Sequence, residues 1–283
     1  MRYLNKTLAL VAFATLLIVS SCQNNEEVVS EDQVSEEALQ SIRKLGFSDA
    51  GVIKTDGGYI VENDIFIPEN RLNEVPSVSI LLRAGDEEQY RTTNVVSTGG
   101  NRTVTVYIPQ GGSTGFSSTY VAALDEAIAR YNAEGLDLKF QRVTSSTGAG
   151  ITFSRLSRRD ERRGVLGSAG FPSNGNPYNQ ILMSGVLESS YGLSVNGIAT
   201  IIAHEMGHCI GFRHTDYFNR AISCGGAASN EGASTVGAIL IPGTPSGASA
   251  AAASWMLACT DGSNRPFNAD DKTALAWMYN GNF

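Results

Sequence analysis

The placing of the histidines is the feature that most constrains this chain. The sequence has three histidines in 283 residues, and all three lie in the segment HEMGHCIGFRH, from His204 to His214. This segment fits the pattern HExxHxxGxxH, which is far more specific than HExxH alone. The apolar stretch VNGIATIIA leads directly into it, and such a stretch predicts a buried helix over 195–210.

The spacing of the motif predicts a zinc site. His204 and His208 are four residues apart, so on a helix their imidazoles project from one face and can bind one ion. Gly211 can adopt the left-handed conformation that ends a helix and turns the chain back, which brings His214 to the same ion. Three imidazole ligands with an open fourth position are typical of a catalytic zinc site. Glu205, offset by one position, is then placed to accept a proton from a water that attacks a carbonyl.

These residues resemble the metzincins, zinc peptidases whose HExxHxxGxxH signature is followed by a turn that contains a methionine. The resemblance implies that the zinc ligands are His204, His208 and His214. It also implies that Glu205 is the general base and acid, and that Met256, in ASWMLAC, is the methionine of the turn.

Within the metzincins, the chain resembles the protease-B-like peptidases called dual-action HEIGH metallopeptidases, over roughly residues 85–283. The segments that carry this resemblance are HEMGHCIGFRHTD, IPGTP and SWMLAC. Met206 replaces the isoleucine of HEIGH, which conserves volume, and Ala258 stands where some metzincins have a zinc-binding tyrosine. The implied fold is α+β: a metzincin-like (zincin) catalytic domain with a twisted mixed sheet, an active-site helix and a Met-turn subdomain.

The resemblance also suggests how a substrate binds. Ser168, Ala169 and Gly170 would belong to the edge strand above the cleft, to which an extended peptide adds as an antiparallel strand. Protein or peptide substrates are therefore expected. Asp216 either orients a histidine through a hydrogen bond or fixes the loop beneath it, and the sequence leaves both roles open.

The N-terminus has the features of an exported lipoprotein. Arg2 and Lys6 precede an apolar run from about Leu8 to Val19, a pattern typical of a signal peptide and too short for a membrane-spanning helix. VSSC, which ends at Cys22, resembles the lipobox in which the cysteine is lipidated, although a cleaved signal with an incidental cysteine is the alternative. We expect an outer-membrane or cell-surface lipoprotein of a Gram-negative-type bacterium. The expected parts are a signal peptide over 1–21, an acidic tether over 22–30, an N-terminal unit over 31–85 and the catalytic domain over 86–283.

The N-terminal unit has a length that suits a pro-segment of a zymogen. Its sequence predicts a helix over 34–45 and strands within 56–68. Because Cys22 is the only cysteine before residue 85 and is expected to carry lipid, we expect a carboxylate to cover the metal. Asp56, Glu62 and Asp64 are the candidates.

Further elements and partners follow from composition and pattern. The catalytic domain is expected to contain strands at 102–109, 136–143 and 150–156, and helices at 117–135 and after Asn268. A net charge of -7 gives no electrostatic footprint for nucleic acid. The arginine-rich segment RLSRRDERRG is interpreted as a solvated segment that pairs with its own acids, with an anionic partner as the alternative.

The remaining cysteines and the C-terminal segment leave alternatives open. Cys209, Cys224 and Cys259 allow one disulfide and one free thiol, and the sequence does not say which pair forms. The stretch DGSNRPFNADD has enough oxygen ligands for Ca²⁺, but its spacing is not that of an EF-hand, and a capped helix start explains it equally well.

Together these patterns predict an exported, lipid-anchored zinc endopeptidase. One alternative is a zinc-binding surface lipoprotein, such as an adhesin or scaffold, that hydrolyses nothing. Another is the zinc-dependent hydrolysis of a non-peptide amide or ester. Glu205 favours hydrolysis, because a binding protein could dispense with the base.

Overall fold

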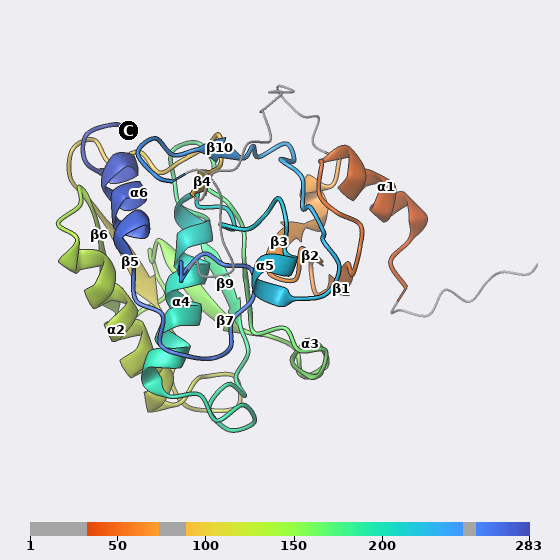
Figure 1. The fold of residues 1–283 in the computed structure, drawn as a ribbon. Coiled ribbons are helices and arrows are strands. Elements are labelled where there is room, and N and C mark those ends of the chain that lie inside the picture. The colour runs from red at the N-terminus through yellow and green to blue at the C-terminus, as the bar shows by residue number, and fades with distance from the viewer. Residues whose placement is uncertain (1–32, 74–88, 246–252) are drawn as a thin grey trace, which may run out of the picture. The chain divides into compact units, whose positions relative to one another are not determined.

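The computed structural model describes residues 33–73, 89–245 and 253–283 (Figure 1). The expected signal peptide, Cys22, the tether and the expected boundary at 85 lie outside these residues. Val34–Phe283 form one compact unit. In the described part of the chain, no helix is long and apolar enough to cross a membrane.

A mixed sheet of eight strands runs through this unit, in the order β1-β2-β3-β8-β9-β7-β5-β6. Pairing is antiparallel from β1 to β3 and between β8 and β9, and parallel at the other junctions. The strands are β1 (Ile53–Thr55), β2 (Gly58–Val61), β3 (Ile65–Pro68), β5 (Arg102–Tyr107), β6 (Leu138–Val143), β7 (Ile151–Arg155), β8 (Gly167–Ala169) and β9 (Gln180–Met183). The expected α+β class with a mixed sheet is confirmed.

Two long helices pack side by side against the sheet (Figure 1). These are α2 and α4: the hydroxyl of Tyr131 on α2 donates to the carbonyl of Ala203 on α4, at 2.7 Å. The apolar faces of the two helices form the main core with β5, β6, β7 and the last helix. The helices are α1 (Glu36–Lys44), α2 (Ser118–Ala133), α3 (Arg158–Arg162), α4 (Val195–Ile210), α5 (Ala221–Cys224), α6 (Ala269–Tyr279) and the 3-10 helix η1 (Glu69–Arg71). A separate pair joins β4 (Tyr90–Arg91) to β10 (Ile239–Leu240).

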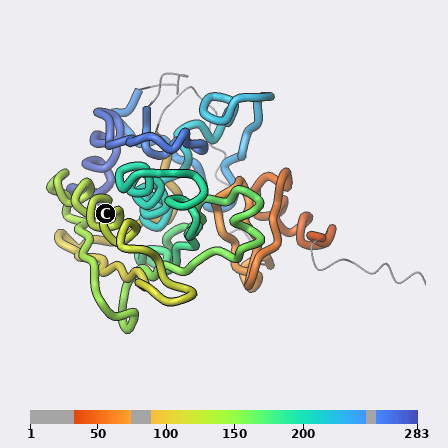
Figure 2. Tube along the Cα trace, turned by 90° about the horizontal axis from the view of Figure 1, so that it is seen from below, coloured from red at the N-terminus to blue at the C-terminus, as the bar shows by residue number. Residues whose placement is uncertain are grey.

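The strands expected in an N-terminal unit belong to the same sheet as the catalytic domain. They lie on one side of α4, whereas α2 and β6 lie on the other (Figures 1 and 2). A second apolar cluster joins α1, β2 and β3 to Phe171. Ile65 of β3 pairs in parallel with Ala169 of β8, and the Ala169 amide donates to the Asp64 carbonyl at 2.9 Å.

This pairing corrects the prediction that Ser168, Ala169 and Gly170 form an edge strand. Strand β8 has β9 on one side and β3 on the other, so Ala169 is fully buried. The Gly170 backbone lies against the ring of Tyr178, where a Cβ would come within 2.8 Å of a ring carbon. The antiparallel position expected for a peptide is therefore filled by the chain's own β3.

Two segments with alternative interpretations form local structure. In the arginine-rich segment, Arg155 pairs with Glu161 at 2.9 Å and Arg163 with Asp160 at 3.7 Å. The expected pairing with its own acids is confirmed, but both acids are buried and the segment includes α3, so it is not a solvated loop. Before α6, the side chain of Asn268 accepts from the Asp271 amide, and Asp271 accepts from the Asn268 amide in return. This reciprocal pair is the helix cap that the oxygen-rich sequence also allowed.

Candidate metal centre

Helix α4 begins and ends where its sequence requires. The hydroxyl of Ser194 accepts from the Gly197 amide at 3.2 Å and caps the first turn. At the other end, Gly211 has a φ of 113° and donates to the carbonyls of Gly207 and His208. A Cβ at Gly211 would lie 3.1 Å from the Thr92 hydroxyl, so both the conformation and the space favour glycine.

The turn at Gly211 brings the three imidazoles together. The Nε2 atom of His208 lies 3.0 Å from Nε2 of His204 and 3.2 Å from Nε2 of His214. The Nδ1 atoms of His204 and His208 point away and donate to the carbonyls of Trp255 and Phe212, each at 2.8 Å. A carbonyl only accepts, so each Nδ1 carries the proton and each Nε2 of a neutral ring presents a lone pair.

The residues present fit a zinc ion. Lone pairs that converge at 3.0 and 3.2 Å repel one another unless a cation lies between them. Nitrogen ligands at about 2.0–2.1 Å from tetrahedral zinc lie about 3.3–3.4 Å apart, close to these separations. Backbone carbonyls that hold the Nδ1 protons are the usual partners of histidine ligands.

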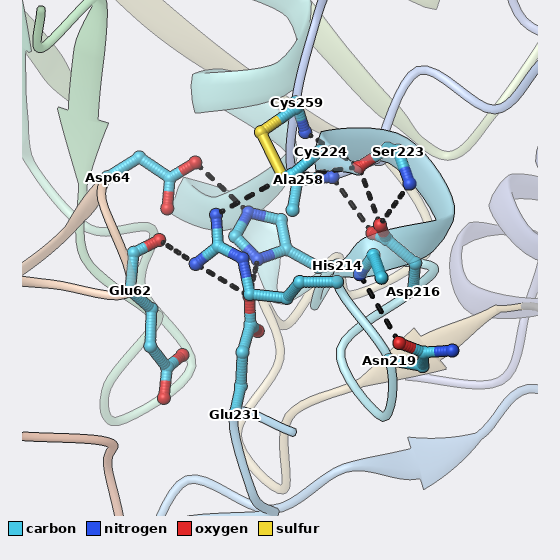
Figure 3. Close-up of a disulfide and its surroundings, with 12 residues drawn as sticks. Glu62, Asp64, His214, Asp216, Asn219, Ser223, Cys224, Glu231, Ala258 and Cys259 are labelled. Carbon is cyan, nitrogen blue, oxygen red and sulfur yellow. Dashed lines mark hydrogen bonds and ion pairs between the residues drawn. A yellow bond between two sulfur atoms is a disulfide. The ribbon is translucent and has the colours of Figure 1, made fainter. Parts of the chain in front are cut away.

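A fourth potential ligand comes from the N-terminal strands. The carboxylate of Asp64 places Oδ2 3.0 Å from Nε2 of His214 (Figure 3). The same oxygen lies 3.4 Å from Nε2 of His204. In the described residues this is the one group of three or more potential metal ligands, and the ligand atoms of Asp64, His204, His208 and His214 lie within 4.8 Å of one another. Of the three carboxylates that the sequence offered as a cover for the metal, Asp64 is the one that lies with the histidines, at the position that the motif alone leaves open.

Glu205 lies beside the centre with one oxygen unused. Its side chain is buried, and Oε2 has no hydrogen-bond partner in the described part of the chain. Strand β8 passes close to it, since a Cβ on Gly167 would come within 2.4 Å of Oε1. Burial raises the pKa of this carboxyl well above its ordinary value, and the charge of Asp64 raises it further. A carboxyl with a raised pKa can hold a proton between two transfers.

Met256 lies directly under the motif helix. It is fully buried, and a Cβ on Gly207 would come within 2.5 Å of its sulfur. The Thr215 amide donates to the Met256 carbonyl at 2.8 Å. Met256 therefore packs against the motif helix one position before His208.

Sequence reasoning missed Glu231, which contacts the third ligand. Its Oε1 lies 2.8 Å from Nδ1 of His214 and 3.2 Å from Nη1 of Arg220, while Arg213 lies 3.7 Å from Oε2. Glu231 is 2% exposed. It stands 17 residues after His214 in a stretch rich in glycine, alanine and serine, where no periodicity or motif marks it.

Replacing Glu231 by glutamine should weaken zinc binding. The carboxylate holds the Nδ1 proton of His214 and strengthens the ring as a ligand, and loss of such a partner costs about 10–100-fold in metal affinity. Competition with a chromophoric chelator measures this affinity. Ser229→Ala, at an exposed position of the same loop, is the control and should bind zinc as the wild type does. Equal affinity in all three proteins would show that Glu231 does not support His214.

Asp216 ties two loops together and contacts no histidine. It accepts from the Ser223 hydroxyl at 2.6 Å and from the Ala258 amide at 2.9 Å (Figure 3). A disulfide between Cys224 and Cys259 joins the same two loops, whereas Cys209 is buried and free. Of the two roles left open by the sequence, the structure places Asp216 in the loop-fixing one.

We expect the disulfide to stabilise the folded protein. The bonded cysteines are 35 residues apart, and closing a loop of this length contributes about 2–4 kcal/mol. The variant with Cys224→Ser and Cys259→Ser should lower the free energy of unfolding by this amount in urea titrations of zinc-saturated protein. Cys209→Ser changes a thiol that forms no disulfide. The difference in unfolding free energy between this variant and the wild type should therefore be the same with and without reductant, whereas reductant itself should destabilise the wild type.

A cavity of about 160 Å³ opens next to His204 and Glu205. Ile201, Trp255 and Leu257 line it with apolar surface. Asn63 and Asp64 line it as well, so the N-terminal strands form part of its wall.

The family of the chain follows from comparison with known proteins. The model of the dual-action HEIGH metallopeptidase family matches residues 60–279. The chain belongs to this family and is a zinc metallopeptidase. No curated protein matches the chain.

Two solved structures of myroilysin are similar to the chain at a low level. One has 16% identity and a TM-score of 0.37, and covers 67% of this chain and 100% of that chain. The other has 17% identity and a TM-score of 0.36, and the match covers 63% of this chain and 84% of that chain. These scores carry no further argument, and the family assignment rests on the family model.

Proposed function

We propose that this protein is an exported, lipid-anchored zinc endopeptidase in which Glu205 acts as general base and acid. One observation carries the proposal: the Nε2 atoms of His204, His208 and His214 converge beside a buried carboxylate oxygen of Glu205 that has no partner in the described residues. Export and lipid attachment at Cys22 rest on the N-terminal sequence alone.

The chemistry follows from the positions of these groups. Bound by the three imidazoles, zinc would lower the pKa of a water and polarise a carbonyl. Oε2 of Glu205 is free to accept a proton from the attacking water. The same carboxyl then passes this proton to the departing amine. The adjacent cavity of about 160 Å³ would accept a side chain of the substrate.

Met256 is proposed as the methionine of a Met-turn. The contact of its sulfur with Gly207 and the bond from Thr215 to its carbonyl support this role. Ala258 contributes its amide to Asp216 and has no side-chain oxygen for zinc, so any stabilisation of the reacting carbonyl must come from other groups.

A second candidate is a zinc-binding protein that hydrolyses nothing. Four protein ligands are typical of structural zinc sites, and Asp64 completes such a set. The family assignment and the unpartnered oxygen of Glu205 favour the peptidase, because a structural site has no use for a buried carboxylate without a partner.

Mass spectrometry of cleavage products tests the proposal. Zinc-loaded protein incubated with an unfolded polypeptide should release internal fragments, and a chelator should stop their release. Intact polypeptide after prolonged incubation with both wild type and Asp64→Asn would contradict peptidase activity. Lipid attachment is tested separately, since Cys22→Ser should move the protein from the membrane fraction to the soluble one.

A further inference from the structure

We infer that the cavity beside Glu205 selects an acidic side chain of the substrate, and that Arg265 is the residue that recognises it. This inference rests on the proposed function and deepens it, because it names the chemical class of peptide that the site takes. Among the described residues that line the cavity, Arg265 is the one that carries a permanent positive charge.

The cavity is placed to accept the residue that follows the scissile bond. Its lining includes both His204 and Glu205. In the proposed mechanism Glu205 passes a proton to the departing amine, so the residue that supplies this amine lies next to Glu205. The side chain of that residue therefore enters this cavity.

The size and the walls of the cavity limit what can enter it. Its volume is about 160 Å³, and a protein cavity of about 150 Å³ holds one benzene molecule. A side chain as large as that of glutamate, glutamine, leucine or methionine therefore fits. Ile201, Trp255 and Leu257 give the cavity apolar surface against which the methylene groups of any of these can pack. The walls alone do not choose among them.

Arg265 adds the charge that makes the choice. Its backbone amide donates to the Thr200 hydroxyl at 2.9 Å, which fixes the residue against α4. Its Nη1 lies 3.3 Å from the carbonyl of Cys259 and 3.5 Å from that of Ser254. Its Nη2 lies 3.8 Å from Oδ1 of Asp261. These contacts are longer than the usual N–H···O distance of about 2.7–3.2 Å, so the guanidinium can form better bonds with a ligand.

Asp261 is a weak competitor for this guanidinium. Its side chain is 72% exposed, and its Oδ1 already accepts from the hydroxyl and the amide of Ser263 at 2.6 and 3.0 Å. An exposed ion pair contributes little. A substrate carboxylate can instead form two parallel, charge-assisted bonds with the planar guanidinium of Arg265. Glutamine or leucine at the same place has no charge to offer.

The two carboxylates that line the cavity belong to the metal centre. Glu205 follows the ligand His204 in the sequence, and Oδ2 of Asp64 lies 3.0 Å from Nε2 of His214. A divalent ion at this centre offsets their negative charge. They therefore do not exclude an acidic side chain that pairs with Arg265.

A group of arginines stands next to the cavity. Arg158 and Arg162 on α3 and Arg163 directly after it are exposed, and the next residue, Gly164, lines the cavity. The chain as a whole has a net charge of -7, so this basic group is a local feature. Such a group attracts acidic segments of a polypeptide. The anionic partner that the arginine-rich sequence allowed is then the substrate itself.

Matched peptides test the inference. Quenched fluorescent peptides differ only in the residue after the scissile bond, which is glutamate, glutamine, leucine or lysine, and mass spectrometry confirms the bond that is cleaved. For the zinc-loaded full chain, kcat/KM should be about 10-fold or more higher with glutamate than with glutamine. Asp64→Asn is assayed in parallel, because Asp64 lines the same cavity.

Reversing the charge of Arg265 should reverse the preference. Arg265→Gln should cleave the glutamate and glutamine peptides at equal rates, and Arg265→Glu should cleave the lysine peptide faster than the glutamate peptide. Damage to the fold cannot produce this gain. The control is Arg142→Gln, which removes a guanidinium that pairs with Asp125 on β6, the last strand of the sheet. It should keep the wild-type preference.

Product binding separates this inference from the proposed function. Labelled peptides that begin with glutamate or glutamine represent the segment after the scissile bond and bind without being cleaved. Fluorescence anisotropy should show about 10-fold tighter binding of the glutamate peptide to the wild type and no difference in Arg265→Gln. If no protein cleaves any peptide, the peptidase proposal fails, while product binding still reports on Arg265.

Three results would overturn recognition by Arg265. One is equal binding of the two product peptides by the wild type. Another is an equal kcat/KM for glutamate and glutamine in an active protein. The third is a preference for glutamate that Arg265→Gln retains, because it would place the recognition of the carboxylate elsewhere.

Discussion

Glu205→Gln should abolish most of the hydrolysis while the protein keeps its zinc. Glutamine has the same shape, but its amide cannot accept a proton from the attacking water or pass one to the leaving amine. General acid–base catalysis of this kind contributes about 10²–10⁴-fold, so the rate of peptide cleavage should fall by that factor. The measurements are the initial rate on a fluorescent peptide and zinc content by atomic absorption on the same samples.

Two comparisons make this result specific. Glu188→Gln changes a carboxylate that bonds Ser117 and Thr119 away from the centre, and it should cleave at the wild-type rate. The pair should also be compared in the Asp64→Asn background, because Asp64 is a potential fourth ligand and lies 3.0 Å from His214. Wild-type cleavage by Glu205→Gln would contradict the assigned role of the carboxylate.

His208→Ala should remove the metal itself. Its Nε2 lies near both other imidazole nitrogens, and its side chain is fully buried, so no neighbouring water can replace it without rearrangement. We expect zinc content at nanomolar free zinc to fall well below one per chain, because the site loses one of its three imidazoles and keeps only His204, His214 and the Asp64 carboxylate. Cleavage should fall at least as far as in Glu205→Gln.

Met206→Leu is the matched control for this variant. Met206 is buried on the same helix two residues before His208, and leucine conserves its volume. It should retain one zinc and near wild-type cleavage. Full zinc occupancy in His208→Ala would show that the ion binds through other residues.

The part of the site that the sequence predicts is the part set by local geometry. The 3.6-residue period fixes which face of α4 carries His204 and His208, and one glycine turn determines where His214 goes. Gly211 has the positive φ that this reasoning requires. The helix ends and most strands of the main sheet follow from equally local patterns of caps, glycines and alternating apolar residues.

The rest of the site depends on contacts between distant segments. Asp64 is 150 residues from His214, and nothing in its own neighbourhood distinguishes it from Asp56 or Glu62. The resemblance predicted an edge strand at β8, and nothing in the sequence of β8 shows that β3 pairs with it. Cys224 bonds to Cys259, 35 residues away, because hydrogen bonds of Asp216 and Ser223 hold the segments that contain the two cysteines together. Each of these depends on the folded arrangement and leaves no periodic trace in the sequence.

Titration of metal-free protein with zinc tests the central claim most directly. The protein is stripped with a chelator, dialysed, and assayed for internal cleavage of a peptide as zinc is added in steps. The rate should be absent without metal, rise in proportion to zinc, and reach a plateau at one ion per chain. Full cleavage by the metal-free protein, or no cleavage at one bound zinc in wild type and Asp64→Asn alike, would contradict a hydrolytic zinc centre at His204, His208 and His214.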